Sequence, residues 1–146
     1  MELDRFGMDI IPVNECLALL RGEPVGRLAI SITDHPDIFP INHVVDHGTV
    51  VFRTAEGTKL AASVLGTAVA YEVDGFDAAA GTAWSVVIKG RAFEIERLED
   101  LIDAAELPLF PWHASPKHRY VRIEPDEISG RRFRVTTPEA RAELGI

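Results

Sequence analysis

A short cluster of polar residues has the side chains of an anion-binding site. Arg53 and Thr54 end an apolar run, and Gly57, Thr58 and Lys59 follow shortly after it. A lysine at the start of a helix can act with the exposed backbone N–H groups there to hold an anion. An arginine adds a two-pronged contact to phosphate oxygens. The sequence therefore predicts a local phosphate site. The alternative is a solvated strand end followed by a surface helix.

Other familiar catalytic patterns do not occur in the sequence. The patterns Gly-x-x-x-x-Gly-Lys-Ser/Thr, Gly-x-Gly-x-x-Gly and Gly-x-Ser-x-Gly are all absent, which argues against the nucleotide and hydrolase sites that they build. The five histidines have no cysteine or carboxylate set at zinc-ligand spacing, so no metal site is predicted. We interpret the single cysteine, Cys16, as a small buried hydrophobe rather than a nucleophile.

Composition and charge limit the functions that the chain can serve. The 146 residues are 47% hydrophobic and 26% charged, which is typical of one globular domain. The net charge of −8 disfavours a broad surface that binds nucleic acid or an anionic membrane. Neither nucleic acid nor a membrane is therefore predicted as a partner. The N-terminus does not have the pattern of a signal peptide, and no apolar run approaches the length of a membrane span. Since one cysteine cannot form an internal disulfide, we expect a soluble cytoplasmic protein.

Alternating apolar residues predict a mainly β fold. Strands are predicted over residues 25–33, 38–45, 48–54, 67–73, 83–96, 120–123 and 130–135, the last either a seventh strand or the end of the sixth. Turns are predicted at 34–37, 46–48 and 124–129. We expect Pro40 to mark a sheet edge or bulge, and Gly90 a bulge or sharp bend. Because the strands follow one another through tight turns, an antiparallel barrel is favoured over a parallel sheet.

Short helices are predicted around this sheet. Asn14 is expected to cap a helix that ends near Arg21, after a loose arm over residues 1–12. The other predicted helices cover residues 59–65, residues 98–106 and, with Thr137 as cap and Pro138 at the first position, part of 136–146.

Two tryptophans occupy different contexts. Trp84 opens a predicted strand, whereas Trp112 lies in a loop bounded by prolines. A buried tryptophan needs a partner for its indole N–H, and a loop tryptophan is harder to bury within its own domain. Packing in the core, stacking on a flat ligand and packing across a dimer all remain open.

Several short motifs occur in a definite order along residues 10–134. They are Glu15-Cys-Leu17, Phe39-Pro-Ile-Asn42, Val51-Phe-Arg-Thr54, Gly57-Thr-Lys-Leu60, Ala70-Tyr-Glu-Val-Asp74, Trp84-Ser-Val-Val87, Gly90-Arg-Ala92 and Pro111-Trp112. Each motif is weak alone. In this order and spacing they resemble the pyridoxamine 5′-phosphate oxidase-like flavin-binding split barrels, with the greatest likeness to the branch related to nitroimidazole-resistance proteins.

The resemblance implies a fold and an assembly. The fold would be a six-stranded antiparallel split β-barrel with peripheral helices, forming one domain over residues 1–146. The assembly would be a homodimer with FMN at the subunit interface. The residues implied in cofactor binding are Phe39, Pro40, Ile41, Asn42, Phe52, Arg53, Thr54, Thr58, Lys59, Leu60, Trp84, Ser85 and Trp112.

The resemblance also divides these residues by role. The run 39–42 would line the isoalloxazine edge, and 52–54 would lie beside the ring and the ribityl chain. Thr58 and Lys59 would hold the phosphate with Arg53. Trp84 and Ser85 would come from the partner chain, and Trp112 would cover the ring.

The implied activity is that of an FMN-dependent oxidoreductase acting on a small molecule, such as a nitroaromatic or a quinone. The alternative is a non-catalytic protein that binds a flavin, a deazaflavin or haem. The arginine-rich signature of true pyridoxamine-phosphate oxidases is not evident, so oxidation of pyridoxamine phosphate is not expected. No residue is assigned as a catalytic acid or base.

Overall fold

The fold is one antiparallel sheet curled into a half-barrel, as the sequence predicts. The computed structural model describes residues 2–55, 66–110 and 119–146. In these residues the strands are β1 (Asp9–Ile10), β2 (Val25–Ile32), β3 (His35–Asn42), β4 (Val44–Asp46), β5 (Thr49–Thr54), β6 (Ala68–Asp77), β7 (Thr82–Glu94) and β8 (Arg119–Arg134). The order across the sheet is β3-β2-β6-β7-β8-β5-β4, and β1 pairs with β8. Six strands were expected; the short β1 and β4 account for the difference.

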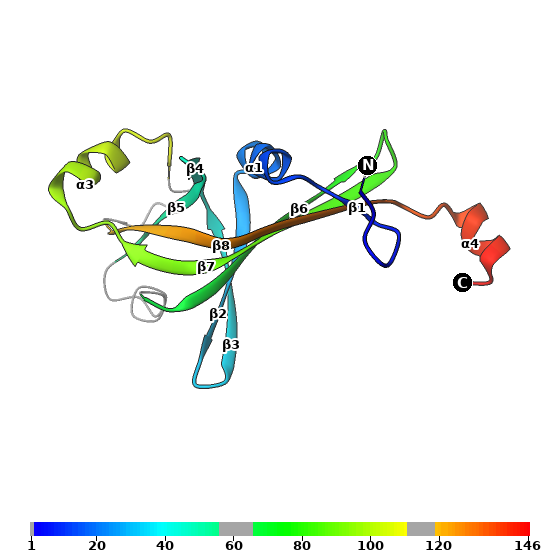
Figure 1. Cartoon of the computed structure of the whole chain (residues 1–146), viewed down its shortest axis with the longest axis horizontal. Coiled ribbons are helices and arrows are strands. Elements are labelled where there is room, and N and C mark those ends of the chain that lie inside the picture. Colours follow the sequence, from blue (N-terminus) through cyan, green and yellow to red (C-terminus); the bar gives the residue numbers. More distant parts are fainter. Residues whose placement is uncertain (1, 56–65, 111–118) are drawn as a thin grey trace.

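β3 and β4 lie at opposite ends of this order, although only His43 separates them in sequence. The sheet must therefore curl so that its two end strands meet. Figure 1 shows the curled sheet, with the β2–β3 hairpin and the far part of the β6–β7–β8 ribbon projecting from it in different directions. The predicted single strand over 38–45 is therefore wrong. Its first part pairs with β2, and only Val44–Asp46 forms the expected hairpin with β5.

Two tight turns set the register of these hairpins. Thr33 and Asp34 have φ of 49° and 61°, and His47 and Gly48 have φ of 49° and 76°. Positive φ at both central residues is typical of the two-residue turns whose twist matches that of the paired strands. The turn before Thr49 agrees with the prediction. The turn predicted at 34–37 is displaced toward the N-terminus, so β3 already begins at His35.

The long β7–β8 pair corrects another expectation. Turns were predicted at 124–129, but β8 runs without a break from Arg119 to Arg134. The register shifts between Lys89 and Gly90, which confirms the predicted bulge, and Pro125 faces Gly90 there. A proline is tolerated at such an irregularity because no ladder donor is required. A Cβ on Gly90 would collide with the Glu124 carbonyl oxygen.

The helices lie at the periphery: α1 (Val13–Gly22), α3 (Leu98–Ala105) and α4 (Pro138–Leu144). The N-cap of α1 is Pro12, so the predicted Asn14 cap is wrong. The Thr137 cap is confirmed, since its hydroxyl accepts a hydrogen bond from the Ala140 N–H at 3.1 Å. The helix predicted over 59–65 lies outside the described residues. No helix in the described part of the chain is long and apolar enough to cross a membrane.

The N-terminal arm is tethered rather than loose. Asp9 and Ile10 pair with Arg132 and Arg131 of β8, and the Asp4 carboxylate accepts hydrogen bonds from two backbone N–H groups and from Arg131. These contacts hold the arm against the ribbon.

In the described residues, the buried apolar side chains form two clusters, one on each side of the sheet. The inner cluster fills the barrel and includes Leu28, Phe52, Tyr71, Ile88 and Ile123. The outer cluster lies under α3 and consists of Val51, Ile95, Ala104 and Leu109, with Tyr120 packed against it. Because neighbouring strand residues face opposite sides, β5 contributes Phe52 to one cluster and Val51 to the other.

Cys16 behaves as the predicted buried hydrophobe. It is fully buried in α1, and its Sγ lies 2.6 Å from the position that a Cβ would take on Gly130. Burial raises the pKa of the Cys16 thiol, which disfavours the reactive thiolate. The glycine thus allows α1 to pack closely on β8.

Candidate functional site

The end of β5 is where the sequence places a phosphate, and here the strand divides its side chains between two faces. Phe52 is 0% and Thr54 is 3% exposed, whereas Arg53 between them is partly exposed. Phe52 belongs to the inner cluster. Of the three predicted residues, Arg53 therefore presents its side chain on the outer face, and the other two help to fix the strand.

Arg53 lies against an aromatic ring on this outer face. Tyr120 is its direct cross-strand partner on β8, and the Arg53 Cζ atom is 5.1 Å from the centre of the Tyr120 ring. A guanidinium at this distance is attracted by the electrons of the ring face. The predicted anion-binding arginine thus has a neighbour that sequence analysis missed, since only the β5–β8 register brings the two together.

The predicted ring-edge run, Phe39 to Asn42, ends β3. Phe39 and Ile41 pack toward the inner cluster, while Pro40 is exposed. Because β3 is at an end of the sheet order, the expectation of an edge proline is confirmed. The Asn42 side-chain N–H₂ donates to the Phe110 carbonyl oxygen at 2.9 Å, which ties the strand end to the segment after α3.

Trp84 and Ser85 lie at the other end of the molecule from Arg53. Trp84 faces Arg132 on β8, and its ring covers Gly75 on β6, where an added Cβ would lie 2.6 Å from the indole. Arg53 faces Tyr120 near the beginning of β8. At 3.3 Å per residue, the stretch of strand from Tyr120 to Arg132 spans up to roughly 40 Å. One protomer does not bring these two groups together.

Four predicted cofactor residues lie outside the described residues: Thr58, Lys59, Leu60 and Trp112. Their roles remain predictions. Within the described ranges, no group of three or more His, Cys, Asp or Glu side chains is placed to hold a metal ion.

A buried polar pair connects the junction of β3 and β4 to the inner strand β6. His43 is 8% exposed; its Nε2 lies 2.9 Å from the Leu20 carbonyl oxygen, and its Nδ1 is 2.5 Å from the Tyr71 hydroxyl. An Nε2–H that donates to Leu20 leaves Nδ1 to accept from Tyr71, which defines a neutral imidazole. Burial lowers the pKa of His43 and raises that of Tyr71, so both stay uncharged.

This pair was not identified from the sequence, although a signal exists. His43 occupies an inward position between the apolar Ile41 and Val45, and Tyr71 alternates with Val69 and Val73. Polar aromatic residues at such positions need buried partners. The Tyr71 O–H also donates to the Ile41 carbonyl oxygen at 3.0 Å, so its single hydrogen is shared between this oxygen and the His43 Nδ1. The pair thus fixes the place where β3 passes into β4.

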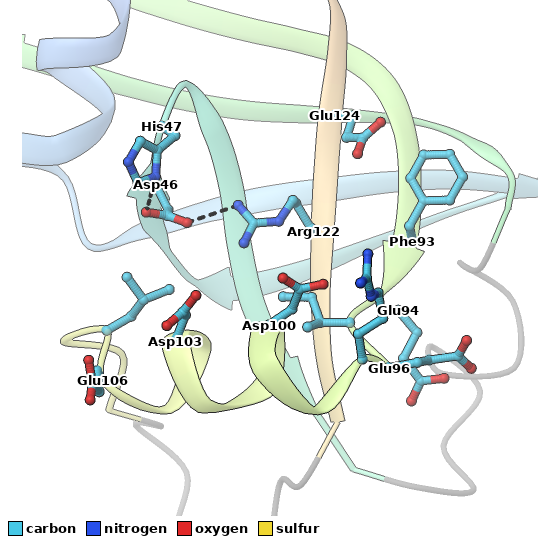
Figure 2. Close-up of a pocket in the computed structure, with 13 residues that line it drawn as sticks. Asp46, His47, Phe93, Glu94, Glu96, Asp100, Asp103, Glu106, Arg122 and Glu124 are labelled. Atoms are coloured by element: carbon cyan, nitrogen blue, oxygen red, sulfur yellow. Dashed lines mark hydrogen bonds and ion pairs between the residues drawn. The ribbon is translucent and has the colours of Figure 1, made fainter.

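A groove of about 710 Å³ lies on the outer face between α3 and the sheet (Figure 2). Its lining residues are Asp46, His47, Phe93, Glu94, Ile95, Glu96, Arg97, Asp100, Asp103, Glu106, Leu107, Arg122 and Glu124. Carboxylates dominate this lining, and Arg122 is already bound to Asp46 at 3.0 Å and to the Thr49 hydroxyl at 2.6 Å. Although this groove is large, its charge repels a phosphate, and it contains none of the predicted cofactor residues. We therefore place the candidate site at the end of β5.

A second ion pair lies at the same edge of the barrel as Arg53. The Glu94 carboxylate accepts from the Nε of Arg119 at 2.6 Å and from its Nη2 at 3.3 Å. Arg119 is the cross-strand partner of Thr54. This two-pronged contact fixes the beginning of β8 beside the candidate site.

Comparison with known proteins adds family information to this geometry. The family model described as pyridoxamine 5′-phosphate oxidase matches residues 12–132. An uncharacterized protein of Mycobacterium tuberculosis strain H37Rv is 34% identical over 138 residues, covering 91% of this chain and 85% of that protein.

Solved structures share the fold. A protein from Mycobacterium smegmatis described as an FAD binding protein is 40% identical, with a TM-score of 0.80, and the match covers 88% of this chain and 100% of that one. A protein from Corynebacterium diphtheriae of unknown function is 38% identical, with a TM-score of 0.73, and the match covers 86% and 98% of the two chains. A candidate 5-nitroimidazole antibiotic resistance protein from Bacteroides thetaiotaomicron, at 12% identity, 86% and 87% coverage and a TM-score of 0.66, is similar in fold alone.

Proposed function

This chain belongs to the pyridoxamine 5′-phosphate oxidase family, and we propose that it is a flavin-dependent oxidoreductase whose flavin phosphate binds at the end of β5. The observation that carries the proposal is the position of Arg53. Its guanidinium lies on the outer face at the strand end, against Tyr120, and the chain continues from there into the predicted Thr58 and Lys59. A phosphate needs cations and N–H donors that converge on it.

The residues present fit a flavin in their chemistry. Arg53 supplies a fixed cation for the phosphate, and the backbone and amide groups of Asn42 and its neighbours supply polar contacts for the ring edge. A bound flavin would supply hydride or electron transfer. The protein would bind it, orient it and exclude water. In this proposal no side chain of the protein moves a proton.

We propose that FMN is the flavin, because the sequence provides one local phosphate site. The Mycobacterium smegmatis relative described as FAD-binding supports the class of cofactor and makes FAD the competing choice. Mass spectrometry of the cofactor released from purified protein distinguishes FMN, FAD and a deazaflavin. Release of FAD alone would overturn the choice of FMN and leave the flavin proposal standing.

We also propose a homodimer with one site at each subunit boundary. Arg53 and Trp84 are separated by up to roughly 40 Å of strand in one protomer, so a second copy is needed if both are to contact one cofactor. The apolar side chains of Phe76 and Phe133, 64% and 45% exposed, lie on the same projecting ribbon as Trp84. Sedimentation at micromolar protein is expected to give a dimer, and a monomer would exclude the shared site.

Turnover is tested with a nicotinamide donor and a small electron acceptor. The purified protein is expected to be yellow and to reduce a quinone or a nitroaromatic compound. Colourless protein that does not bind added FMN or FAD would contradict the proposal. Protein that binds flavin without turnover would retain the cofactor and remove the enzyme assignment.

A further inference from the structure

We infer that Tyr120 is a positioning residue for the flavin phosphate: its ring holds the Arg53 guanidinium in the orientation that the phosphate requires. The inference rests on the proposed function, because it concerns the same site. It adds a residue outside the run of positions that the family motifs identify.

The contact is built into the sheet. Arg53 and Tyr120 are direct partners in the β5–β8 pairing, and side chains of such partners on one face lie close enough to interact. An arginine side chain has many rotamers, and a planar guanidinium stacked on a ring loses fewer of them when it binds an anion. The contact with the Tyr120 ring thus prepares the Arg53 guanidinium for its ligand.

Tyr120 is itself held in place. It packs against the outer cluster of Val51, Ile95, Ala104 and Leu109, which lies between the sheet and α3. A row of packed side chains therefore connects α3 to Tyr120 and then to Arg53. In this arrangement the helix supports the site without contacting the ligand.

An aromatic ring can hold a cation without neutralising its charge, whereas a carboxylate neutralises it. Arg122, on the same strand as Tyr120 and two residues along, is fixed by the Asp46 carboxylate, which neutralises it. The contact between Tyr120 and Arg53 adds orientation without adding a negative charge.

The experiment compares FMN with riboflavin, which has the same ring and ribityl chain but no phosphate. Dissociation constants are measured by flavin fluorescence titration of cofactor-free full-length protein. Tyr120→Leu keeps an apolar contact with the outer cluster but removes the ring, and Tyr120→Phe keeps the ring. We expect Tyr120→Leu to weaken FMN binding about five- to tenfold and to leave riboflavin binding unchanged. Tyr120→Phe should bind both like the wild type.

Arg53→Lys provides a second variant that does not disturb the outer cluster. Lysine keeps the charge but lacks the planar fork, so it should lower the preference for FMN over riboflavin as Tyr120→Leu does. In an Arg53→Ala background, Tyr120→Leu should have no further effect on FMN binding.

The outcomes separate the inference from the function on which it rests. Equal weakening of FMN and riboflavin by Tyr120→Leu would indicate a purely structural role and overturn the inference, as would an unchanged preference in both Tyr120→Leu and Arg53→Lys. In either case a wild-type protein that binds FMN preserves the proposed function. A wild-type protein that binds neither flavin removes both.

Discussion

The outer face of the sheet presents two arginines whose surroundings differ. Arg122 lies in the acidic groove, where Asp46 binds its guanidinium (Figure 2). The Thr49 hydroxyl binds it as well. Arg53 lies nearer the strand end, against the ring of Tyr120. The first arginine fixes the β4–β5 hairpin to β8, and the second packs on an aromatic ring at the edge of the barrel. The type and position of an arginine in the sequence therefore do not identify an anion site; its partners in the fold must also be known.

The comparison also explains how an acidic chain can bind an anion. The carboxylates of the groove, such as Asp100 and Asp103 on α3, would repel a phosphate placed among them. The phosphate site is predicted at a strand end outside this lining. Net charge therefore describes the whole surface, and the site depends on a few local groups.

Removing Arg53 should have the largest effect. Arg53→Ala is expected to weaken FMN binding about 10- to 100-fold, since charge-assisted hydrogen bonds to the phosphate are lost. The matched control, Arg122→Ala, should bind FMN like the wild type, because the guanidinium of Arg122 is bound to Asp46 in the wild-type protein. Fluorescence titration measures both. Equal losses in the two variants would remove the distinction between the two arginines.

Breaking the ion pair between Arg122 and Asp46 should lower the free energy of unfolding without changing cofactor binding. Asp46→Ala leaves a partly buried guanidinium with one fewer partner, at a cost of about 1–2 kcal/mol in the free energy of unfolding. The control is Glu99→Ala, whose pair with Arg97 is exposed and should be worth less than about 1 kcal/mol. Urea titration gives both values. A tenfold loss of FMN affinity in Asp46→Ala would show that the groove belongs to the cofactor site.

The pH dependence of the free energy of unfolding tests the role of the buried His43. The buried His43 has a lowered pKa in the folded protein, so folding favours its neutral form. The stability that the neutral His43 contributes is fully present above the pKa of about 6.5 that a histidine has in the unfolded chain. It is lost as the pH falls through the lower pKa of the folded state, and the free energy of unfolding then changes by at most about 1.4 kcal/mol per pH unit.

His43→Phe should remove this part of the acid sensitivity, whereas His47→Gln in the groove should keep it, because that variant leaves His43 and its buried partners unchanged. Urea unfolding between pH 7.5 and 5, roughly the range over which an imidazole titrates, measures the slopes. Identical slopes for wild type and His43→Phe would assign the acid sensitivity to other groups.

Neutralising the groove should have the smallest effect. The triple variant Asp100→Asn, Asp103→Asn and Glu106→Gln is expected to strengthen FMN binding by less than about threefold in low salt, with no difference in about 1 M salt, because salt screens these charges. The control is Glu139→Gln with Glu143→Gln on α4, which lies at the opposite end of the molecule from α3 (Figure 1). Weakened FMN binding in the triple variant would place the cofactor in the groove.

Features determined by neighbouring residues were predictable from the sequence. The Thr137 cap, the Asp46-His47-Gly48 turn and the bulge at Gly90 each depend on the conformational limits of a few adjacent residues. The Asn14 cap was wrong because Pro12, with its fixed φ, already occupies the position before the helix.

Features determined by pairing between distant segments were not predictable in the same way. Residues 124–129 contain Pro125 and charged side chains, which indicate turns, yet β7 supplies a partner for every residue of the segment except Asp126 at the bulge. Arg53 was identified by its type and place, but Tyr120 was not, because their contact depends on the β5–β8 register. The burial of His43 likewise depends on the closing of the sheet.

The continuity of β8 has a consequence for how this chain can change in length during evolution. Deleting one residue between Arg119 and Gly130 would turn every later side chain to the opposite face, so Val121 and Ile123 could not stay in the barrel while Arg132 kept its place beside β1. Insertions and deletions among related sequences should therefore be confined to places such as the turn after Asp77 and the segment after Arg134. An alignment of homologues with frequent gaps inside β8 would contradict this constraint.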